Sequence, residues 1–278
     1  MGPESLEAPW KRWAWYLLLT GLSVLVLFPI YMTLVRALST PAAYVREGLP
    51  LYPVKPQWDV FARAFDEGDL GGRMLLSAVV TLIIVAAQLV TSVLAAYAFT
   101  FLDFVGKRVV FLVFMATLML PIEVTLIPNA QLVRDLGWFN SLPGLTAPFL
   151  ATAFGVFLIR QGFMSIPRDL RDAAALDGFG HLAFLRRVAI PVTRPVIGSF
   201  AVIAFLSAWN QYTWPRAVVD ESQWATIQIA LRAVATSTVE ESNIGFAAAI
   251  IAALPILVLL ILLQRQLIRG LTAGAVKG

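Results

Sequence analysis

The feature that most constrains this chain is a series of long apolar runs separated by shorter polar segments. A helix that crosses a hydrocarbon core of about 30 Å needs about 20 mostly apolar residues. With 59% hydrophobic and 14% charged residues among 278, the sequence predicts one all-α integral membrane domain with six transmembrane helices. The expected spans are Trp13–Val35, Leu75–Phe99, Val109–Pro128, Pro143–Ile159, Val196–Trp214 and Ile244–Leu263.

The first run is followed by Ala37-Leu38-Ser39, which superficially resembles a signal-peptide cleavage site. The apolar part of a signal peptide is about 7–15 residues long, and this run is longer. We therefore interpret Trp13–Val35 as a membrane anchor.

Six spans place both termini on one side of the membrane, and the charges predict which side. Segments that would then face the cytoplasm hold 13 of the 21 basic residues but only 6 of the 17 acidic residues. Cytoplasmic loops carry an excess of Lys and Arg, so we expect both termini inside, in contact with membrane lipid. The expected outer loops are Ser39–Arg73, Asn129–Leu142 and Pro215–Asn243.

Several kinds of catalytic site lack their residues in this sequence. Cysteine is absent and His181 is the single histidine, so we expect no metal site and no thiol chemistry. Without a G-x-x-x-x-G-K-[ST] motif, the chain would depend on a separate subunit to bind ATP. The motifs of zinc proteases and serine hydrolases are also absent, so we expect a protein that is not an enzyme.

The longest polar interruption is Ser165–Pro195, which we expect to form two helices outside the bilayer. Pro167 and Asp169 suit the start of a helix over Arg168–Leu176, because proline and acidic residues favour the first turn. Ala173-Ala174-Ala175 would give this helix a face small enough for another backbone to approach.

An elbow is expected at Gly178 and Gly180, since glycine tolerates the backbone dihedrals that a sharp turn needs. A second short helix would follow over His181–Val188. That helix would be apolar at Leu182 and Leu185, basic at Arg186 and Arg187, and ended by Pro191 and Pro195.

These residues resemble the EAA loop of ABC-importer permeases, whose pattern is E-A-A-x-x-D-G and, farther on, an apolar residue and proline. The matching residues are Asp172-Ala173-Ala174, Asp177-Gly178 and Ile190-Pro191. Two residues differ from the usual pattern, because Asp172 replaces a glutamate and Phe179 replaces an alanine. The alternative interpretation is an amphipathic segment on the membrane surface.

The resemblance implies that this loop docks into a cleft on an ATP-binding subunit and carries its motion into the membrane. It implies a coupling role for Asp172, Ala173, Ala174, Asp177, Gly178, Gly180, His181, Leu182, Leu185, Arg186 and Arg187.

Four further segments are similar to the carbohydrate-type branch of this family, and within it to the second permease of glycerol-3-phosphate and glycerophosphodiester importers. They are Met119–Val124, Phe157–Pro167, Trp209–Pro215 and Gln264–Leu271. The resemblance implies a type I ABC importer permease fold in the inner membrane of a prokaryote. It also implies a homologous permease as heterodimer partner, two ATP-binding subunits that hold ATP and Mg, and an extracytoplasmic solute-binding protein.

Polar residues inside the spans are candidates for a translocation pathway, because an ionisable or amide group facing lipid is costly. They are Gln88, Glu123, Trp209, Asn210 and Gln211. Glu123 follows Pro121, where we expect the third span to be broken, and counted along its helix it would lie about 22 Å from Arg108, at the outer depth of Asn210. Gln88, Thr91 and Ser92 share one helix face. The alternative role for these groups is hydrogen bonding between packed helices.

The expected outer loop Arg216–Ser242 has two open interpretations. In maltose-type relatives the corresponding loop enters the open cleft of the docked binding protein and helps to displace solute. The residues implied in that contact are Ala233, Ala235, Thr236, Ser237 and Thr238. The alternative is a plain solvated connection.

The solute is expected to be small, polar and organic. No Lys or Arg lies in the middle of any expected span, so this half of the pore has no arginine clamp for phosphate. The lone carboxylate of Glu123 would favour a zwitterionic ester such as glycerophosphocholine over glycerol-3-phosphate. A sugar is the main alternative solute, and a secondary transporter is the alternative from another class of protein.

Overall fold

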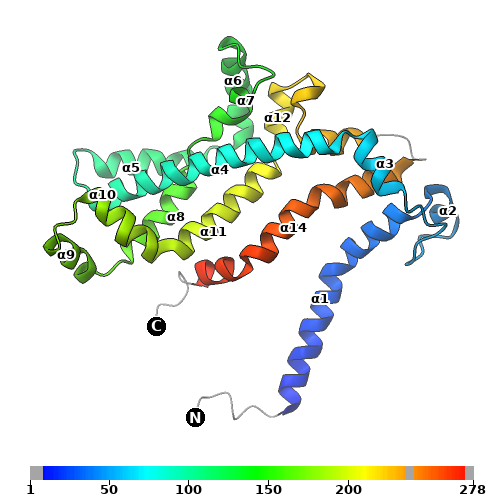
Figure 1. Ribbon diagram of the computed structural model, residues 1–278, viewed down its shortest axis with the longest axis horizontal. Coiled ribbons are helices and arrows are strands. Elements are labelled where there is room, and N and C mark those ends of the chain that lie inside the picture. Colours follow the sequence, from blue (N-terminus) through cyan, green and yellow to red (C-terminus); the bar gives the residue numbers. More distant parts are fainter. Residues whose placement is uncertain (1–8, 236–240, 273–278) are drawn as a thin grey trace. The chain divides into compact units, whose positions relative to one another are not determined.

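The structure is a computed structural model that describes residues 9–235 and 241–272. Within these ranges the chain is built from helices and contains no strand. Figure 1 shows how the chain runs through them. In order, they are α1 (Pro9–Leu38), α2 (Pro41–Arg46), α3 (Val60–Glu67), α4 (Leu70–Phe101), α5 (Lys107–Ala116), η2 (Thr117–Met119), α6 (Ile122–Asp135), α7 (Leu142–Thr146), η3 (Ala147–Phe149), α8 (Ala153–Met164), α9 (Arg168–Leu176), α10 (His181–Phe184), η4 (Leu185–Ala189), α11 (Ile190–Trp209), α12 (Thr213–Val218), η5 (Ser222–Trp224), α13 (Ile227–Ala235) and α14 (Ser242–Thr272).

The described helices include four that are long and apolar enough to cross a membrane. They are Arg12–Leu38, Leu70–Phe101, His181–Trp209 and Ser242–Gln264. Two bent helix pairs, Lys107–Met119 with Ile122–Asp135 and Leu142–Phe149 with Ala153–Met164, bring the number to six if each pair is one span. This agrees with the six spans expected from the sequence.

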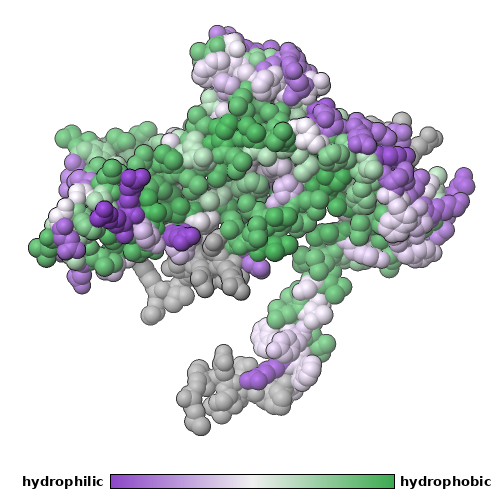
Figure 2. Space-filling view, in the orientation of Figure 1, coloured by the Kyte–Doolittle hydropathy of each residue, from purple (hydrophilic) through white to green (hydrophobic). Residues whose placement is uncertain are grey.

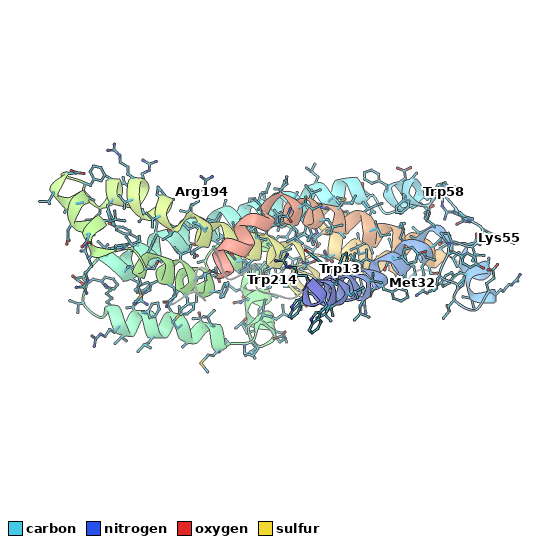
Figure 3. All side chains as sticks on the ribbon, turned by 90° about the horizontal axis from the view of Figure 1, so that it is seen from below. Trp13, Met32, Lys55, Trp58, Arg194 and Trp214 are labelled. Atoms are coloured by element: carbon cyan, nitrogen blue, oxygen red, sulfur yellow. The ribbon has the colours of Figure 1, made fainter. Side chains whose placement is uncertain are left out.

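The chain divides into two compact units, the first formed by the residues up to Leu70 and by Leu231–Ala253. In this unit the segment after α1 is folded against its neighbours. The Tyr31 hydroxyl donates to the Leu51 carbonyl at 2.6 Å, and the Val54 N–H donates to Ser39 Oγ at 3.0 Å. Figure 3 labels Trp13 and Met32 on α1, and Lys55 and Trp58 on this folded segment. The expected outer loop Ser39–Arg73 therefore contains ordered structure.

The second unit comprises Gly71–Ala230 and the chain from Leu254 onward, and its core lies where α4, α8 and α11 meet. Gly155 on α8 is needed for this close approach, because an added Cβ would overlap Ser92 Oγ and a ring carbon of Phe200. Both of those side chains are buried, so neither has free space to move into. Figure 2 shows apolar surface over the middle of this unit, with hydrophilic residues near α9 and α10 and near α6 and α7.

The third span, expected over Val109–Pro128 with a break at Pro121, is indeed broken there, and the break is far sharper than a simple kink. The helix ends at Met119, and α6 starts in a direction that differs by 99°. Pro121 has φ −62° and ψ 139° and caps the new helix, while Leu120 before it is extended. Proline disfavours a helical conformation in the residue that precedes it, which explains the break. Pro128 lies inside α6, so the expected loop Asn129–Leu142 begins as helix.

Two other span boundaries also differ from expectation. The fourth span consists of α7 with η3 and of α8, which are bent by 44° at residues 150–152. The fifth helix, α11, ends at Trp209, and Trp214 belongs to the separate helix α12.

Candidate functional site

The turn after α9 confirms an elbow at Gly178. The Phe179 N–H donates to the Ala174 carbonyl at 2.9 Å, and the Gly178 N–H donates to the Ala175 carbonyl at 3.1 Å. This is the Schellman arrangement, which places the residue directly after the helix C-cap in the left-handed conformation. Gly178 accordingly has φ +75°, a value that glycine adopts without strain. Gly180 is extended, with φ −73° and ψ 171°, and precedes α10.

The expectation that Pro191 and Pro195 end a short second helix is wrong. The helix runs from His181 to Trp209 through α10, the π-helical turn η4 and α11. Pro191 lies in the first turn of α11, directly after η4. A π turn is wider than an α turn, so it relieves the clash between the proline ring and the carbonyl four residues earlier. The second arm of the elbow therefore continues directly into a candidate membrane span.

The three alanines of α9 do not form one face. Successive helical residues are rotated by about 100°, and Ala174 alone of the three is buried. Ala174 packs into the chain's own core, beside Ile166 and Phe184. Asp172 and Ala173 are exposed, as is Leu176 at 89% of its surface. The exposed side of α9 around Asp172 and Leu176 therefore combines a carboxylate with apolar groups, and Arg168, one turn before Asp172, is exposed as well.

The second arm also separates residues that were expected to act together. Leu182 is 64% exposed, whereas Leu185 is 5% exposed and belongs to the core. Arg186 is exposed, and the Arg187 guanidinium lies 5.3 Å from the centre of the Phe179 ring. His181 Nδ1 lies 3.0 Å from the hydroxyl of Tyr97 on α4, which ties the elbow to a candidate span.

Gln88 and its neighbours do share a face of α4, and that face meets the break in the fourth span. The Gln88 amide donates to the Phe149 carbonyl at 2.8 Å, and the Thr91 hydroxyl donates to the Leu150 carbonyl at 3.1 Å. Ser92 lies against Gly155. These bonds satisfy carbonyls that the bend leaves free, so Gln88 has a structural role there. Its part in a pathway stays a prediction.

The other pathway candidates lie in different environments. Glu123 is exposed in the first turn of α6, and the 99° bend invalidates its depth counted along one helix. Trp209 is 2% exposed and stacks on Phe205 at a centroid distance of 5.8 Å. Asn210 is exposed, donates to the Leu206 carbonyl at 2.9 Å and accepts from Gln228 at 3.5 Å.

Gln211 has a buried Oε1 atom with no hydrogen-bond partner among the described residues. A buried polar atom of this kind is costly unless another molecule satisfies it. The joint role of Glu123, Asn210 and Gln211 in a pathway stays a prediction.

The segment after α12 is packed structure as far as Ala230, so a plain solvated connection is wrong for this part. Asn140 Oδ1 accepts from the Asp220 N–H at 2.9 Å, and the Ile227 N–H donates to Ser77 Oγ at 2.8 Å. Trp214, labelled in Figure 3, donates from Nε1 to the Gly144 carbonyl at 3.1 Å. Sequence reasoning missed Asn140. Glycine and asparagine are both common in turns, and Gly137 and Asn140 stand close together in the sequence. The φ of Asn140 is +51°, in the left-handed region that asparagine tolerates.

Of the residues expected to contact a binding protein, Ala233 and Ala235 lie at the end of α13. Thr236, Ser237 and Thr238 lie outside the described residues.

The candidate spans and the glycine elbow outside them define a class, the multi-pass permeases of the inner membrane. Residues 88–273 match the family described as binding-protein-dependent transport system inner membrane component. The chain belongs to this family, and it is a permease subunit of a binding-protein-dependent importer.

Curated relatives agree with this assignment over most of the chain. The chain is 33% identical over 257 residues to the sn-glycerol-3-phosphate transport system permease protein UgpE of Rhizobium meliloti, covering 89% of this chain and 91% of the relative. It is 30% identical over 256 residues to the protein of the same name from Yersinia pestis, with the same coverage.

A solved structure has the same fold. It is a chain of a bacterial ABC transporter involved in the import of the acidic polysaccharide alginate, with a TM-score of 0.80. The match covers 94% of this chain and 98% of that chain at 22% sequence identity.

Proposed function

We propose that this chain pairs with a homologous permease, and that two ATP-binding subunits and an extracytoplasmic binding protein complete the importer. The elbow carries the proposal, because its left-handed Gly178 stands at the glycine of the D-G pair in the coupling motif. Relatives of the same family are permease subunits rather than enzymes. ATP and Mg would therefore bind to the partner subunits.

The elbow is suited to transmit motion in two steps. The exposed face with Asp172, Ala173 and Leu176 is available to a partner ATPase, and Asp177 and Gly178 shape the turn behind it. The arm from His181 then continues without interruption to Trp209. Closure of the ATPases would move α9, and the continuous helix would carry that motion across the membrane. Alternating access of a central cavity is the expected result.

We propose a glycerophosphodiester such as glycerophosphocholine, or glycerol-3-phosphate, as the solute. The names of the relatives support this class of compound. Arg160, a basic residue on α8, contacts the Phe99 carbonyl at 3.5 Å and the Phe111 ring at 4.4 Å, so its guanidinium is held by the chain itself. The absence of a free arginine on this helix favours the zwitterionic diester, and Glu123 would attract its cation.

Two measurements test the proposal. Mass spectrometry of the gently solubilised complex should identify an ATPase, a second permease and a binding protein. Competition uptake assays should show stronger inhibition by glycerophosphocholine than by disaccharides. Competition by disaccharides alone would replace the solute with a sugar, and the absence of an ATPase from the complex would refute the importer proposal.

A further inference from the structure

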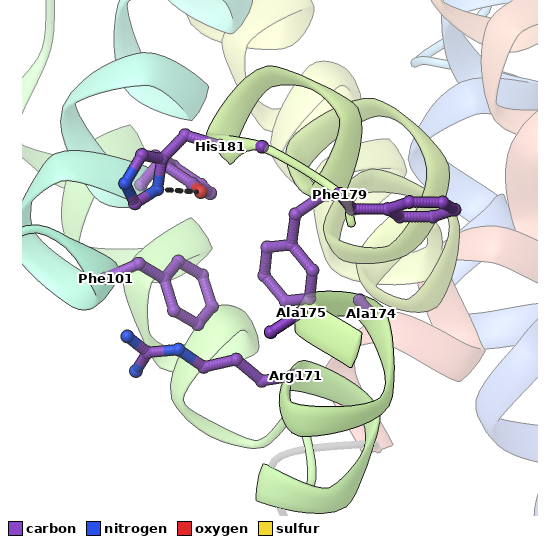
Figure 4. A pocket seen from close by; sticks show the side chains of 9 residues that line it. Phe101, Arg171, Ala174, Ala175, Phe179 and His181 are labelled. Carbon is purple, nitrogen blue, oxygen red and sulfur yellow. Dashed lines mark hydrogen bonds between the residues drawn. The ribbon is translucent and has the colours of Figure 1, made fainter. Parts of the chain in front are cut away.

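A pocket of about 200 Å³ lies on the inner side of the elbow, between α9, the start of α10 and the end of α4 (Figure 4). Its floor is formed by the buried residues Tyr97, Ala174 and Phe184, and the rings of Phe101 and Phe179 also line it. Four aromatic rings therefore line the pocket together with the polar side chains of Arg171 and His181. Aromatic rings combined with a few placed polar groups are typical of small-molecule sites, and this pocket is smaller than those that hold drug-sized ligands, so its ligand would be small.

Two nitrogen-bearing side chains stand at the rim of this pocket. The Arg171 guanidinium lies 5.8 Å from the centre of the Phe101 ring and forms no ion pair with a described residue. His181 is oriented by its 3.0 Å contact between Nδ1 and the Tyr97 hydroxyl, which leaves Nε2 without a partner among the described residues. Both groups border the pocket, as Figure 4 shows. A guanidinium without an ion pair among the described residues favours an anionic group at this rim.

The pocket and the proposed ATPase-facing surface occupy different faces of α9. Arg171, Ala174 and Ala175 line the pocket, whereas Asp172, Ala173 and Leu176 do not. A partner that covers the outward face therefore leaves the pocket to a separate molecule. The positive charge of Arg171 at the rim and the aromatic lining together fit an anionic ligand with a planar apolar body.

We infer that this pocket binds a small cytosolic anion with an aromatic or similarly planar body, and that occupancy regulates coupling. The inference rests on the coupling function proposed above for the elbow. A bound anion would connect Arg171 on α9 with His181 on α10 and with the end of α4. It would thus hold the elbow at one angle, and a ligand that favours one conformation shifts the equilibrium of the whole element.

Phenyl phosphate is a suitable probe, because it combines the charge with the ring. The permease pair with its ATPases, reconstituted in phosphatidylcholine nanodiscs without the binding protein, would be titrated by calorimetry. Arg171→Gln should weaken binding about tenfold or more, since it removes a charge-assisted hydrogen bond. Ala175→Leu should abolish binding by filling the pocket. Arg168→Gln is the matched control, because Arg168 is an exposed arginine of the same helix that does not line the pocket.

Addition of the binding protein and its solute then gives the second readout. Phenyl phosphate should lower the solute-stimulated ATPase rate of the native and Arg168→Gln complexes, each compared with its own rate without probe. It should not change the rate of the Arg171→Gln complex.

Four results would overturn the inference: no binding, equal weakening by Arg168→Gln, equal binding of inorganic phosphate, or equal binding of benzyl alcohol. If the complex transports solute but phenyl phosphate neither binds to it nor changes its ATPase rate, the inference about the pocket is refuted and the proposed function stands. Failure of the chain to assemble with an ATPase would instead refute the proposed function.

Discussion

Replacing Gly178 by valine should uncouple the ATPases from transport while leaving the chain inserted in the membrane. Gly178 has φ +75°, and no atom lies within 4 Å of the position that a Cβ would take. The cost is therefore backbone strain rather than a clash. A left-handed conformation costs an L-residue about 1–2 kcal/mol, and a β-branched residue is an outlier there.

The elbow can relieve this strain only by losing the two backbone hydrogen bonds that Phe179 and Gly178 donate to Ala174 and Ala175. A change of about 1–2 kcal/mol lowers the ratio of native to rearranged elbow about 5–30-fold. We expect a similar loss in the ATPase rate stimulated by the binding protein and its solute. The assay is ATP hydrolysis by the reconstituted complex, together with uptake into proteoliposomes.

Two variants separate coupling from general damage. Gly178→Asn should retain most of the activity, because asparagine tolerates the left-handed conformation. Gly48→Val introduces the same kind of strain in the other unit, at φ +74° with equally open space. A wild-type stimulated rate in Gly178→Val would refute the reasoning, as would an equal loss in Gly48→Val.

Four further predictions concern other parts of the chain. Asp172→Glu should support uptake at the native rate, because it restores the residue usual in the motif; a large loss would contradict a docking carboxylate. Gly155→Ala should cost about 1–3 kcal/mol through overpacking, whereas Gly162→Ala, whose added Cβ would have its nearest neighbours at 3.4 Å, should change the melting temperature much less. Equal melting temperatures would disprove the tight crossing. Deletion of residues 233–238 should lower uptake without changing solute affinity of the isolated binding protein, and undiminished uptake would make this segment a linker. Glu123→Gln should weaken competition by glycerophosphocholine more than by glycerol-3-phosphate; equal effects would remove Glu123 from the pathway.

The sequence by itself determined the features that depend on local chemistry. Long apolar runs predict spans because the bilayer requires a minimum length, and the family assignment confirms a membrane permease. The elbow at Gly178 was also predictable, since a helix that ends in a sharp turn needs a left-handed residue there. The absence of an ATP-binding motif likewise predicted that a separate subunit binds ATP.

The break at Pro121 was predictable, but tertiary structure decided how far it turns the chain and what the other prolines do. Pro121 turns the chain by 99°, Pro128 remains inside a helix, and Pro191 follows a π turn in a helix that continues. All three lack an N–H, so their local chemistry is alike. Whether the chain breaks or continues depends on which neighbouring groups satisfy the carbonyls and fill the space around the ring.

Contacts between distant residues were likewise settled by the fold. Gln88 meets the Phe149 carbonyl 61 residues away, and Tyr97 meets His181 84 residues away. Helical periodicity predicted that Gln88, Thr91 and Ser92 share a face, but not what that face would touch. The pocket of Tyr97, Phe101 and Arg171 left no sequence signal at all, because its walls come from separate helices and exist only when α9 packs beside α4.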